Sequence, residues 1–360
     1  RFCITSVTMP PPGCRWVIGI KEISLVKLSS FFLGLFLCGI LSVAALTVSA
    51  NERFVGRVDQ QKLSGVKALL DIREAEVDFA RAKLTIDKMI DPSVDVEHEL
   101  SRLNRIVQKI RSSGAQTSLQ KKDALRYYLY QAGEWNGHRP FTYDFDDPKG
   151  TNIGNKLLSR YLDSRKGNCI SMPFLFIVLA QKLNLDVSAS TAPLHVFVKF
   201  TDDVSGITYN LETTSGANVT RDAWLRQGFP MTDTALKEGI YLQKLSKSET
   251  VAVMAITLLQ DYFEKKDYAQ LIATADLILD VYPKAISAII YKAAAYTQIL
   301  KERKLWHYRK PQDVPAQKQA AFKYLVSRIN QLNRRAVKLG WRPPNQAAEE
   351  EYLRKIRQQD

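Results

Sequence analysis

The 360-residue chain is long enough for two domains, and its 46% hydrophobic and 24% charged residues are those of an ordinary globular protein. Its net charge of +14 is uneven, because residues 301–360 hold 15 Lys/Arg and 6 Asp/Glu, which is +9 of the total. No pattern of Arg and aromatic residues typical of a nucleic-acid module is visible, so nucleic acid is excluded as the expected partner.

The N-terminal segment predicts export. Basic residues precede an uncharged stretch whose apolar part runs from Phe31 to Val48, and the small residues of Val48-Ser49-Ala50 are typical of a signal-peptidase site. The apolar part is also long enough to cross a bilayer. Residues 1–50 are therefore predicted to be a signal peptide, cut after Ala50, or an N-terminal anchor that contacts the membrane if it is not cleaved. Both alternatives place the body outside the cytoplasm, in the periplasm or cell envelope.

The cysteines single out one position. Cys3, Cys14 and Cys38 lie in or before the export segment, so the mature body would keep Cys169 alone, without an internal disulfide framework. A lone thiol in an oxidising compartment is a liability unless it is buried or used, and an inert buried cysteine is the alternative to a functional one. One cysteine and scattered histidines give no ligand set, so neither a metal nor another cofactor is expected.

Residues 51–131 have the apolar periodicity of scaffold helices, with breaks at Asp91-Pro92 and at Ser113-Gly114. Residues 132–156 are rich in Gly, Pro and Asp and predict a loop. Its acidic residues Asp144, Asp146 and Asp147 have the alternation of a calcium site but match no complete calcium loop, which favours a turn with solvated or Arg-paired carboxylates. A short helix over 156–163 follows.

The stretch Arg165 to Pro173 ends this loop and opens the apolar run Phe174 to Ala180, which predicts a buried helix. Cys169 therefore lies at or next to a helix N-terminus. There the unpaired N–H groups and the positive end of the helix dipole favour thiolate over thiol.

A β-hairpin is predicted next, with strands over 194–200 and 207–212 and a turn over 201–206. A symmetric turn pairs Phe200 with Ile207 and thereby places His195 directly opposite Glu212, within about 5 Å between Cβ atoms. Asn210 lies on the same face and is the alternative partner for His195. We interpret Cys169 as a nucleophile, His195 as its base and Glu212 as the group that orients the base. The backbone N–H of Cys169 is the expected first oxyanion donor, and Asn168 is a candidate for the second.

Beyond Ser246 the chain is predicted to be helical, with amphipathic segments over 250–263, 269–281 and 285–300 and a last, basic helix over 316–339. Tyr262 and Tyr296 are 34 residues apart, and Pro283 closes the second segment where a tetratricopeptide repeat (TPR) has its proline. This predicts one and a half TPR-like repeats, with a generic helical hairpin as the alternative. These helices could bind a protein, and the basic tail could contact anionic lipid, lipopolysaccharide or teichoic polymer or be simply solvated.

Three motifs together resemble the bacterial transglutaminase-like superfamily: Gly167-Asn168-Cys169 before an apolar helix, Ala192 to Val198, and Asn210 to Gly216. The resemblance covers roughly residues 90–240. It implies a papain-like α+β core, with the cysteine on a helix and the histidine and an acid on antiparallel strands. In that family the acid is usually Asp, whereas Glu212 occupies its place here. The resemblance also implies acyl transfer at an amide through a thioester on Cys169. If the acyl group passes to water, the enzyme is a peptidase or amidase, and if it passes to a lysine amine, the enzyme is a cross-linker. We favour hydrolysis.

The sequence thus predicts five regions: 1–50 for export or anchoring, 51–131 a helical scaffold, 132–245 a transglutaminase-like catalytic core, 246–305 TPR-like helices and 306–360 a basic helical tail. The leading hypothesis is a cysteine-dependent enzyme acting on a peptide, protein or other amide-containing substrate of the envelope. The alternatives are a non-catalytic interaction module of the same fold and a purely structural envelope protein.

Overall fold

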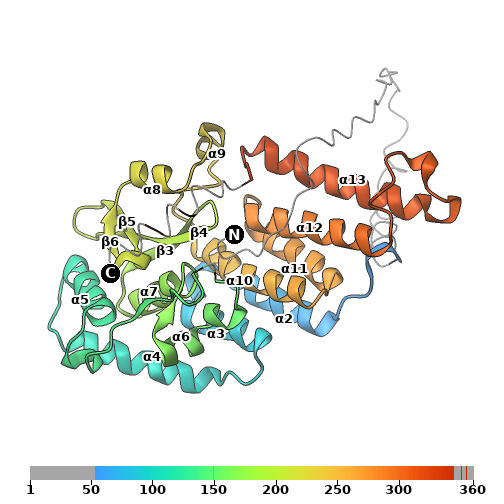
Figure 1. Cartoon of the computed structure of the whole chain (residues 1–360). Helices are drawn as coiled ribbons and strands as arrows, with labels where there is room; N and C mark the ends of the chain where they lie inside the picture. Colours follow the sequence, from blue (N-terminus) through green and yellow to red (C-terminus); the bar gives the residue numbers. More distant parts are fainter. Residues whose placement is uncertain (1–52, 149, 344–349, 351–353, 355–360) are drawn as a thin grey trace, which may run out of the picture.

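The computed structural model describes residues 53–148, 150–343, 350 and 354. It has a helix-rich α+β architecture, in which one small antiparallel sheet is surrounded by helices and followed by further helices toward the C-terminus (Figure 1). This confirms the predicted fold class. The export segment, residues 1–50, lies outside the described residues. Within the described part of the chain, no helix is long and apolar enough to cross a membrane.

The N-terminal scaffold contains α2 (Gln60–Leu70), α3 (Phe79–Ile90), α4 (Val96–Arg111) and α5 (Ser118–Tyr130). Each begins at a residue whose side chain accepts a hydrogen bond from the backbone of the first turn; these residues are Asp59, Asp78, Asp95 and Thr117. Such caps satisfy N–H groups that a helix start leaves unpaired. A capping side chain close in the sequence therefore determines where each of these scaffold helices begins.

Short elements lead from this scaffold to the buried helix of the core. They are the 3-10 turns Glu134–Asn136 and Ile153–Lys156, the two-residue parallel strands β1 (Thr142–Tyr143) and β2 (Lys166–Gly167), and helix α6 (Leu158–Ser164). A further 3-10 turn, Glu74–Glu76, lies within the scaffold between α2 and α3. Helix α7 (Ser171–Lys182) follows β2 and is buried from Ser171 to Ala180. A helix that is apolar on all sides needs neighbours on all sides, and α7 contacts α3, α4, α5, α6 and the sheet.

The sheet has the order β3-β4-β5-β6, formed by β3 (Asp186–Ala192), β4 (His195–Thr201), β5 (Thr208–Glu212) and β6 (Asn218–Thr220). Neighbouring strands are antiparallel throughout. Strand β4 is buried along nearly its whole length, because α7 packs against it on one side and other elements cover the side chains that face away. Val196, Val198 and Phe200 make one face of β4 apolar, whereas the other face carries His195, Phe197 and Lys199.

The predicted pairing of the hairpin is wrong by two residues. Phe200 pairs with Tyr209 rather than with Ile207, and the register continues through Thr201 and Thr208. The turn is shifted because Asp202 organises it: its carboxylate accepts hydrogen bonds from the backbone and hydroxyl of Ser205, and its carbonyl accepts from Gly206. Gly206 has φ +68°, which favours glycine. Since a shift of two residues preserves the face, Glu212 stays on the side of His195 but lies diagonally across from it.

A 3-10 turn (Thr213–Ser215) connects β5 to β6. The short helices α8 (Asp222–Gly228) and α9 (Asp233–Lys237) follow the sheet. The long helices α10 (Lys247–Glu264), α11 (Tyr268–Val281), α12 (Ile286–Glu302) and α13 (Ala316–Lys338) pack one on the next beside the core, with the turn Pro311–Asp313 before α13 (Figure 1). Their bounds agree with the predicted segments. Assignment of α10–α12 as TPR-like repeats stays a prediction.

Helix α10 joins the two parts of the molecule. It contacts α3 and β3 on one side and α11 and α12 on the other. Thr250, in its first turn, accepts a hydrogen bond from the backbone of Ala189 on β3 over 3.2 Å. The C-terminal helices are therefore packed on the core through a shared element.

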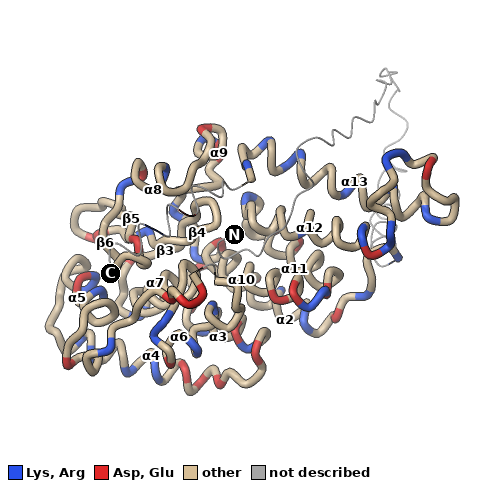
Figure 2. Tube along the Cα trace, in the orientation of Figure 1, with Lys and Arg blue, Asp and Glu red and all other residues tan. Residues whose placement is uncertain are grey.

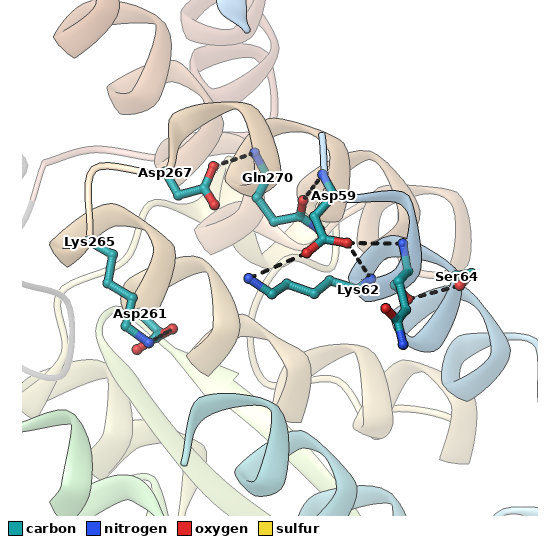
Figure 3. Close-up of polar contacts among 8 residues, drawn as sticks. Asp59, Lys62, Ser64, Asp261, Lys265, Asp267 and Gln270 are labelled. Atoms are coloured by element: carbon teal, nitrogen blue, oxygen red, sulfur yellow. Dashed lines mark hydrogen bonds and ion pairs between the residues drawn. The ribbon is translucent and has the colours of Figure 1, made fainter. Parts of the chain in front are cut away.

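The start of α2 is attached to the C-terminal helices (Figure 3). The backbone N–H of Asp59 donates to Oε1 of the buried Gln270 on α11 over 3.0 Å, while the Asp59 carboxylate accepts from Gln61 and Lys62. On the same helix, Asp267 caps the backbone of Gln270 over 3.2 Å. The hydrogen bond between Asp59 and Gln270 joins residues 211 positions apart in the sequence and attaches the start of α2 to α11.

Basic side chains follow the last long helix. Figure 2 shows Lys and Arg along α13, which has no Asp or Glu in its sequence. Its buried residues, among them Phe322 and Leu325, face α12. The predicted basic helix therefore packs by one face and leaves its charges at the surface.

Candidate active site

Cys169 lies two residues before the first residue of α7 and is fully buried. It belongs to the loop between β2 and α7, where the chain turns from the short parallel strand into the apolar helix. Pro173, in the first helical turn, has no N–H, so one of the unpaired donors of a helix start is absent. The positive end of the α7 dipole still points toward the cysteine, as predicted from the sequence.

Asn168 caps α7. Its Oδ1 accepts from the backbone of Ile170 over 2.9 Å and of Ser171 over 3.2 Å, and its Nδ2 donates to the carbonyl of Asn155 over 3.3 Å. Gly150 has φ +55°, and a Cβ there would lie 3.0 Å from Asn168 Nδ2. The carboxamide is therefore held inside the loop, an arrangement that favours a capping role. Its role as an oxyanion donor stays a prediction.

His195 and Glu212 form a buried pair. Nε2 of His195 lies 2.7 Å from Oε2 of Glu212, and both side chains are almost completely shielded from solvent. The other carboxylate oxygen of Glu212 accepts from the backbone and hydroxyl of Thr214 over 3.1 and 2.7 Å. Both oxygens are thus engaged, which fixes the direction in which the carboxylate faces the imidazole.

The protonation of Glu212 follows from these contacts. Burial alone raises the pKa of a carboxyl, but the charge and hydrogen bond of His195, together with the Thr214 donors, more than offset this and hold the pKa of Glu212 below its usual range. The carboxylate is therefore ionised at neutral pH and can stabilise a positive charge on His195.

Two phenylalanines face the imidazole. The ring of Phe229, which follows α8, stacks on His195 with a centroid distance of 4.5 Å and an interplanar angle of 13°, and Phe197 lies parallel at 6.5 Å. An aromatic face attracts a cation, so this stack is compatible with a protonated imidazole and excludes water from it. Phe229 has no sequence motif that would mark it, and only the folded chain brings it to the site.

The backbone of Leu194 connects the cysteine with the histidine. Its carbonyl oxygen lies 3.8 Å from Sγ of Cys169, and the next residue along the chain is His195. Leu194 has φ +59°, which is unusual for a residue with a side chain. Such strain persists only where the surrounding structure imposes it and is frequent at functional sites.

Asn210, the alternative partner for His195, lies elsewhere. It pairs with Lys199 across the sheet, and its Nδ2 donates to Oδ1 of Asp222 over 2.6 Å and to the carbonyl of Thr220 over 3.3 Å. Glu212 is thus the group that the structure brings to the imidazole.

Cys169 is disulfide-bonded in the structure, and the other three cysteines of the chain lie outside the described residues. A thiolate is the nucleophilic form of cysteine, so chemistry at this position requires the bond to be reduced first.

The acidic loop forms turns. Asp144 accepts from the backbone of Asp146, Asp147 accepts from Thr151 and Asn152, and Asp146 pairs with Lys166 over 2.7 Å. No group of three or more His, Cys, Asp or Glu residues in the described part of the chain could hold a metal ion.

A cavity of about 620 Å³ adjoins Glu212. It lies between α5, β1 and the ends of β5 and β6, and Met172 in the first turn of α7 forms part of its wall. The sequence did not reveal this cavity, because its walls come from segments far apart in the chain.

Comparison with known proteins finds a family match over part of the chain. Residues 97–254 match the family model of the transglutaminase-like superfamily. The matched range begins in α4, includes α7 and the whole sheet, and ends in α10, so it contains Cys169, His195 and Glu212. No curated protein and no solved structure matches the chain.

Proposed function

We propose that residues 97–254, which match the family model of the transglutaminase-like superfamily, form a domain that transfers acyl groups from amides through Cys169. The contact that supports this most strongly is the buried hydrogen bond of 2.7 Å between His195 and Glu212, next to a residue whose carbonyl contacts the cysteine sulfur. A base that is oriented by a third group, close to a nucleophile at a helix N-terminus, is the arrangement that covalent catalysis uses.

In the proposed reaction the reduced thiol of Cys169 transfers its proton to Nδ1 of His195 and its sulfur attacks the amide carbonyl carbon. The oxygen of the tetrahedral intermediate accepts a hydrogen bond from the backbone N–H of Cys169. His195 then gives the proton to the leaving nitrogen as the C–N bond breaks, which leaves a thioester. Water, deprotonated by His195, attacks the thioester and restores the thiol. Glu212 keeps the imidazole tautomer and stabilises its positive charge throughout.

We propose hydrolysis rather than cross-linking as the main outcome, on a peptide, protein or other amide substrate in the cell envelope. The proposed location is based on residues 1–50, whose composition predicts export. The C-terminal helices are proposed to hold a protein partner.

A non-catalytic interaction module is the second candidate, and the burial of Cys169 favours it. The side chain has 0% of its surface exposed, so a substrate reaches the sulfur only after a local opening. In that case the transglutaminase-like domain would be a scaffold for binding.

Acyl-enzyme trapping separates these candidates. The full-length protein is reduced, freed of reductant and mixed with 4-nitrophenyl acetate, and the Cys169 peptide is analysed by mass spectrometry. An enzyme gives a burst of nitrophenol together with an acetyl group on Cys169, and His195→Ala loses the burst while Asn210→Ala keeps it. Absence of acetyl-Cys169 in the reduced wild-type protein would contradict catalysis and favour the binding module.

A further inference from the structure

The cavity beside Glu212 has the features of a binding site that the proposed chemistry does not yet use. Its walls include Arg126 and Tyr130 from α5, the aromatic rings of Phe141, Tyr143 and Trp224, and Glu212 itself. The remaining walls are largely polar, so the cavity offers both aromatic rings and hydrogen-bonding groups to a small molecule.

Arg126 gives this cavity a positive charge. Its Nε and Nη2 donate to neutral acceptors, the carbonyl of Gly216 and Oδ1 of Asn218, each over 2.8 Å. No carboxylate among the described residues forms an ion pair with Arg126. The anion in the same lining, Glu212, is already paired with His195. A guanidinium has five donors, so Arg126 retains hydrogen-bonding capacity for an anion.

Tyr130 adds a second donor. Tyr130 lines the same cavity, and its hydroxyl is buried and has no hydrogen-bond partner in the described part of the chain. Burial, with a smaller effect from the Glu212 carboxylate, raises the pKa of Tyr130 above its usual value, so the hydroxyl stays protonated and can donate. Buried polar atoms normally have partners, and one without a partner at a cavity wall is a position that a ligand oxygen would satisfy.

We infer that this cavity binds an organic carboxylate with an aromatic body, whose carboxylate contacts Arg126 and Tyr130 and whose ring packs on the aromatic walls. We further infer that this ligand is the non-reacting part of the acyl donor, because the cavity shares Glu212 with the candidate active site and Met172 with the first turn of α7. This second step depends on the proposed function, whereas the binding site itself does not.

A matched pair of probes tests the site: hippurate, which has a phenyl ring and a carboxylate, and hippuramide, in which a neutral amide replaces the carboxylate. Binding is measured by calorimetry on the full chain with Cys169→Ser, which cannot react. Hippurate should bind at least about tenfold more tightly than hippuramide, a difference of about 1.4 kcal/mol. Arg126→Gln should abolish that preference, Arg126→Lys should keep part of it, and the exposed control Arg105→Gln should leave it unchanged.

Tyr130→Phe keeps the test decisive if Arg126→Gln does not fold. Removing a hydroxyl without a partner should keep or raise the melting temperature of the empty protein, yet weaken hippurate binding several-fold. Three results would each contradict the proposed binding site: equal binding of the two probes, no binding of hippurate at millimolar concentration, or a preference for hippurate that persists in Arg126→Gln.

Protection of Cys169 tests the second step. In the reduced wild-type protein, hippurate should slow alkylation of Cys169 by iodoacetamide, and this protection should be lost in Arg126→Gln. If hippurate binds with the stated preference but gives no protection, the site stands and the assignment to the acyl donor fails. If Cys169 is not catalytic at all, the binding measurement with Cys169→Ser is unaffected, so the two failures are distinguishable.

Discussion

Two buried ionic groups in this molecule are built from similar parts but have different surroundings. The pair His195–Glu212 lies at the edge of the sheet next to a cavity, whereas Lys83, Asp87 and Lys156 are enclosed between α3, the turn before α6, and α10. Lys83 pairs with Asp87 and donates to the carbonyl of Lys156 over 2.9 Å, and the ammonium of Lys156 donates to Gln260 on α10.

The pKa shifts favour the charged form of Glu212 in the first group and the neutral forms of Asp87 and Lys156 in the second. In Glu212, the histidine and two Thr214 donors outweigh burial and lower the pKa. In Asp87, burial outweighs the charge of Lys83 and raises the pKa, and burial lowers the pKa of Lys156 to about 7. The comparison teaches that burial alone does not mark an active site. What distinguishes His195–Glu212 is that its contacts favour the charged form of Glu212, that the neighbouring Leu194 carbonyl contacts Cys169, and that a cavity adjoins it.

Asp87→Ala should have the largest effect and should act on stability. It leaves the Lys83 ammonium buried without its carboxylate and removes the acceptor of the Leu158 backbone, at a cost of about 3–5 kcal/mol. Urea unfolding measures this. The matched control is Glu97→Ala, which breaks the exposed pair with Arg81 and should cost less than about 1 kcal/mol. Equal losses of unfolding free energy in the two variants would show that the buried contacts of Asp87 stabilise the fold no more than an exposed ion pair does.

Glu212→Gln should act mainly on reactivity. Glutamine keeps the shape of the side chain but cannot balance an imidazolium, so alkylation of reduced Cys169 at pH 6 should slow by at least about tenfold. Mass spectrometry of the Cys169 peptide over time gives the rate. An unchanged rate would mean that Glu212 supports the fold without tuning the histidine.

The dependence of protein stability on acid pH tests the pKa shift of Glu212. Because the folded-state pKa of Glu212 is lowered, its contribution to stability is present above the unfolded-state pKa of about 4.3 and is lost as pH falls through the folded-state value. The difference in melting temperature between wild type and Glu212→Gln should therefore shrink from pH 6 to pH 3. A difference that is constant over this range would contradict the assigned shift.

Lys156 should give a dependence of the same sign at higher pH. Its pKa is about 7 when folded and about 10.4 when unfolded, so between these values the unfolded chain binds more protons and stability rises with pH, by at most about 1.4 kcal/mol per pH unit. Unfolding measured from pH 7 to pH 10 should show this rise in wild type and less of it in Lys156→Met. The exposed Lys265→Met is the control and should keep the wild-type slope.

Asn210→Ala should have the smallest effect. It loses the hydrogen bonds to Asp222 and Thr220, which costs about 1 kcal/mol of stability, and it should leave the alkylation rate of Cys169 unchanged. If Asn210→Ala slowed alkylation as much as Glu212→Gln, Asn210 would be an orienting residue after all.

The sequence predicted those features that local chemistry determines. The scaffold helices followed from apolar periodicity with breaks at Asp91-Pro92 and Ser113-Gly114, and the buried helix after Cys169 followed from its unbroken apolar run. The face shared by His195 and Glu212 followed from strand alternation, and it survived the error in the register because the shift was by an even number of residues.

Features that depend on distant segments could not be predicted. The turn at Asp202 is fixed partly by Ser118, which belongs to α5 and donates to its carboxylate. The stack of Phe229 on His195 and the cavity next to Glu212 are likewise formed by residues from separate elements. A periodicity argument contains no information about such contacts.

The pH dependence of Cys169 alkylation by iodoacetamide, in reduced wild type and His195→Ala, tests most directly whether these residues act as one unit. A thiolate–imidazolium pair predicts rapid alkylation well below the ordinary thiol pKa of about 8.5, with this reactivity lost in His195→Ala. A thiol that reacts only when the protein unfolds, or equally in both proteins, would contradict the proposed catalytic role.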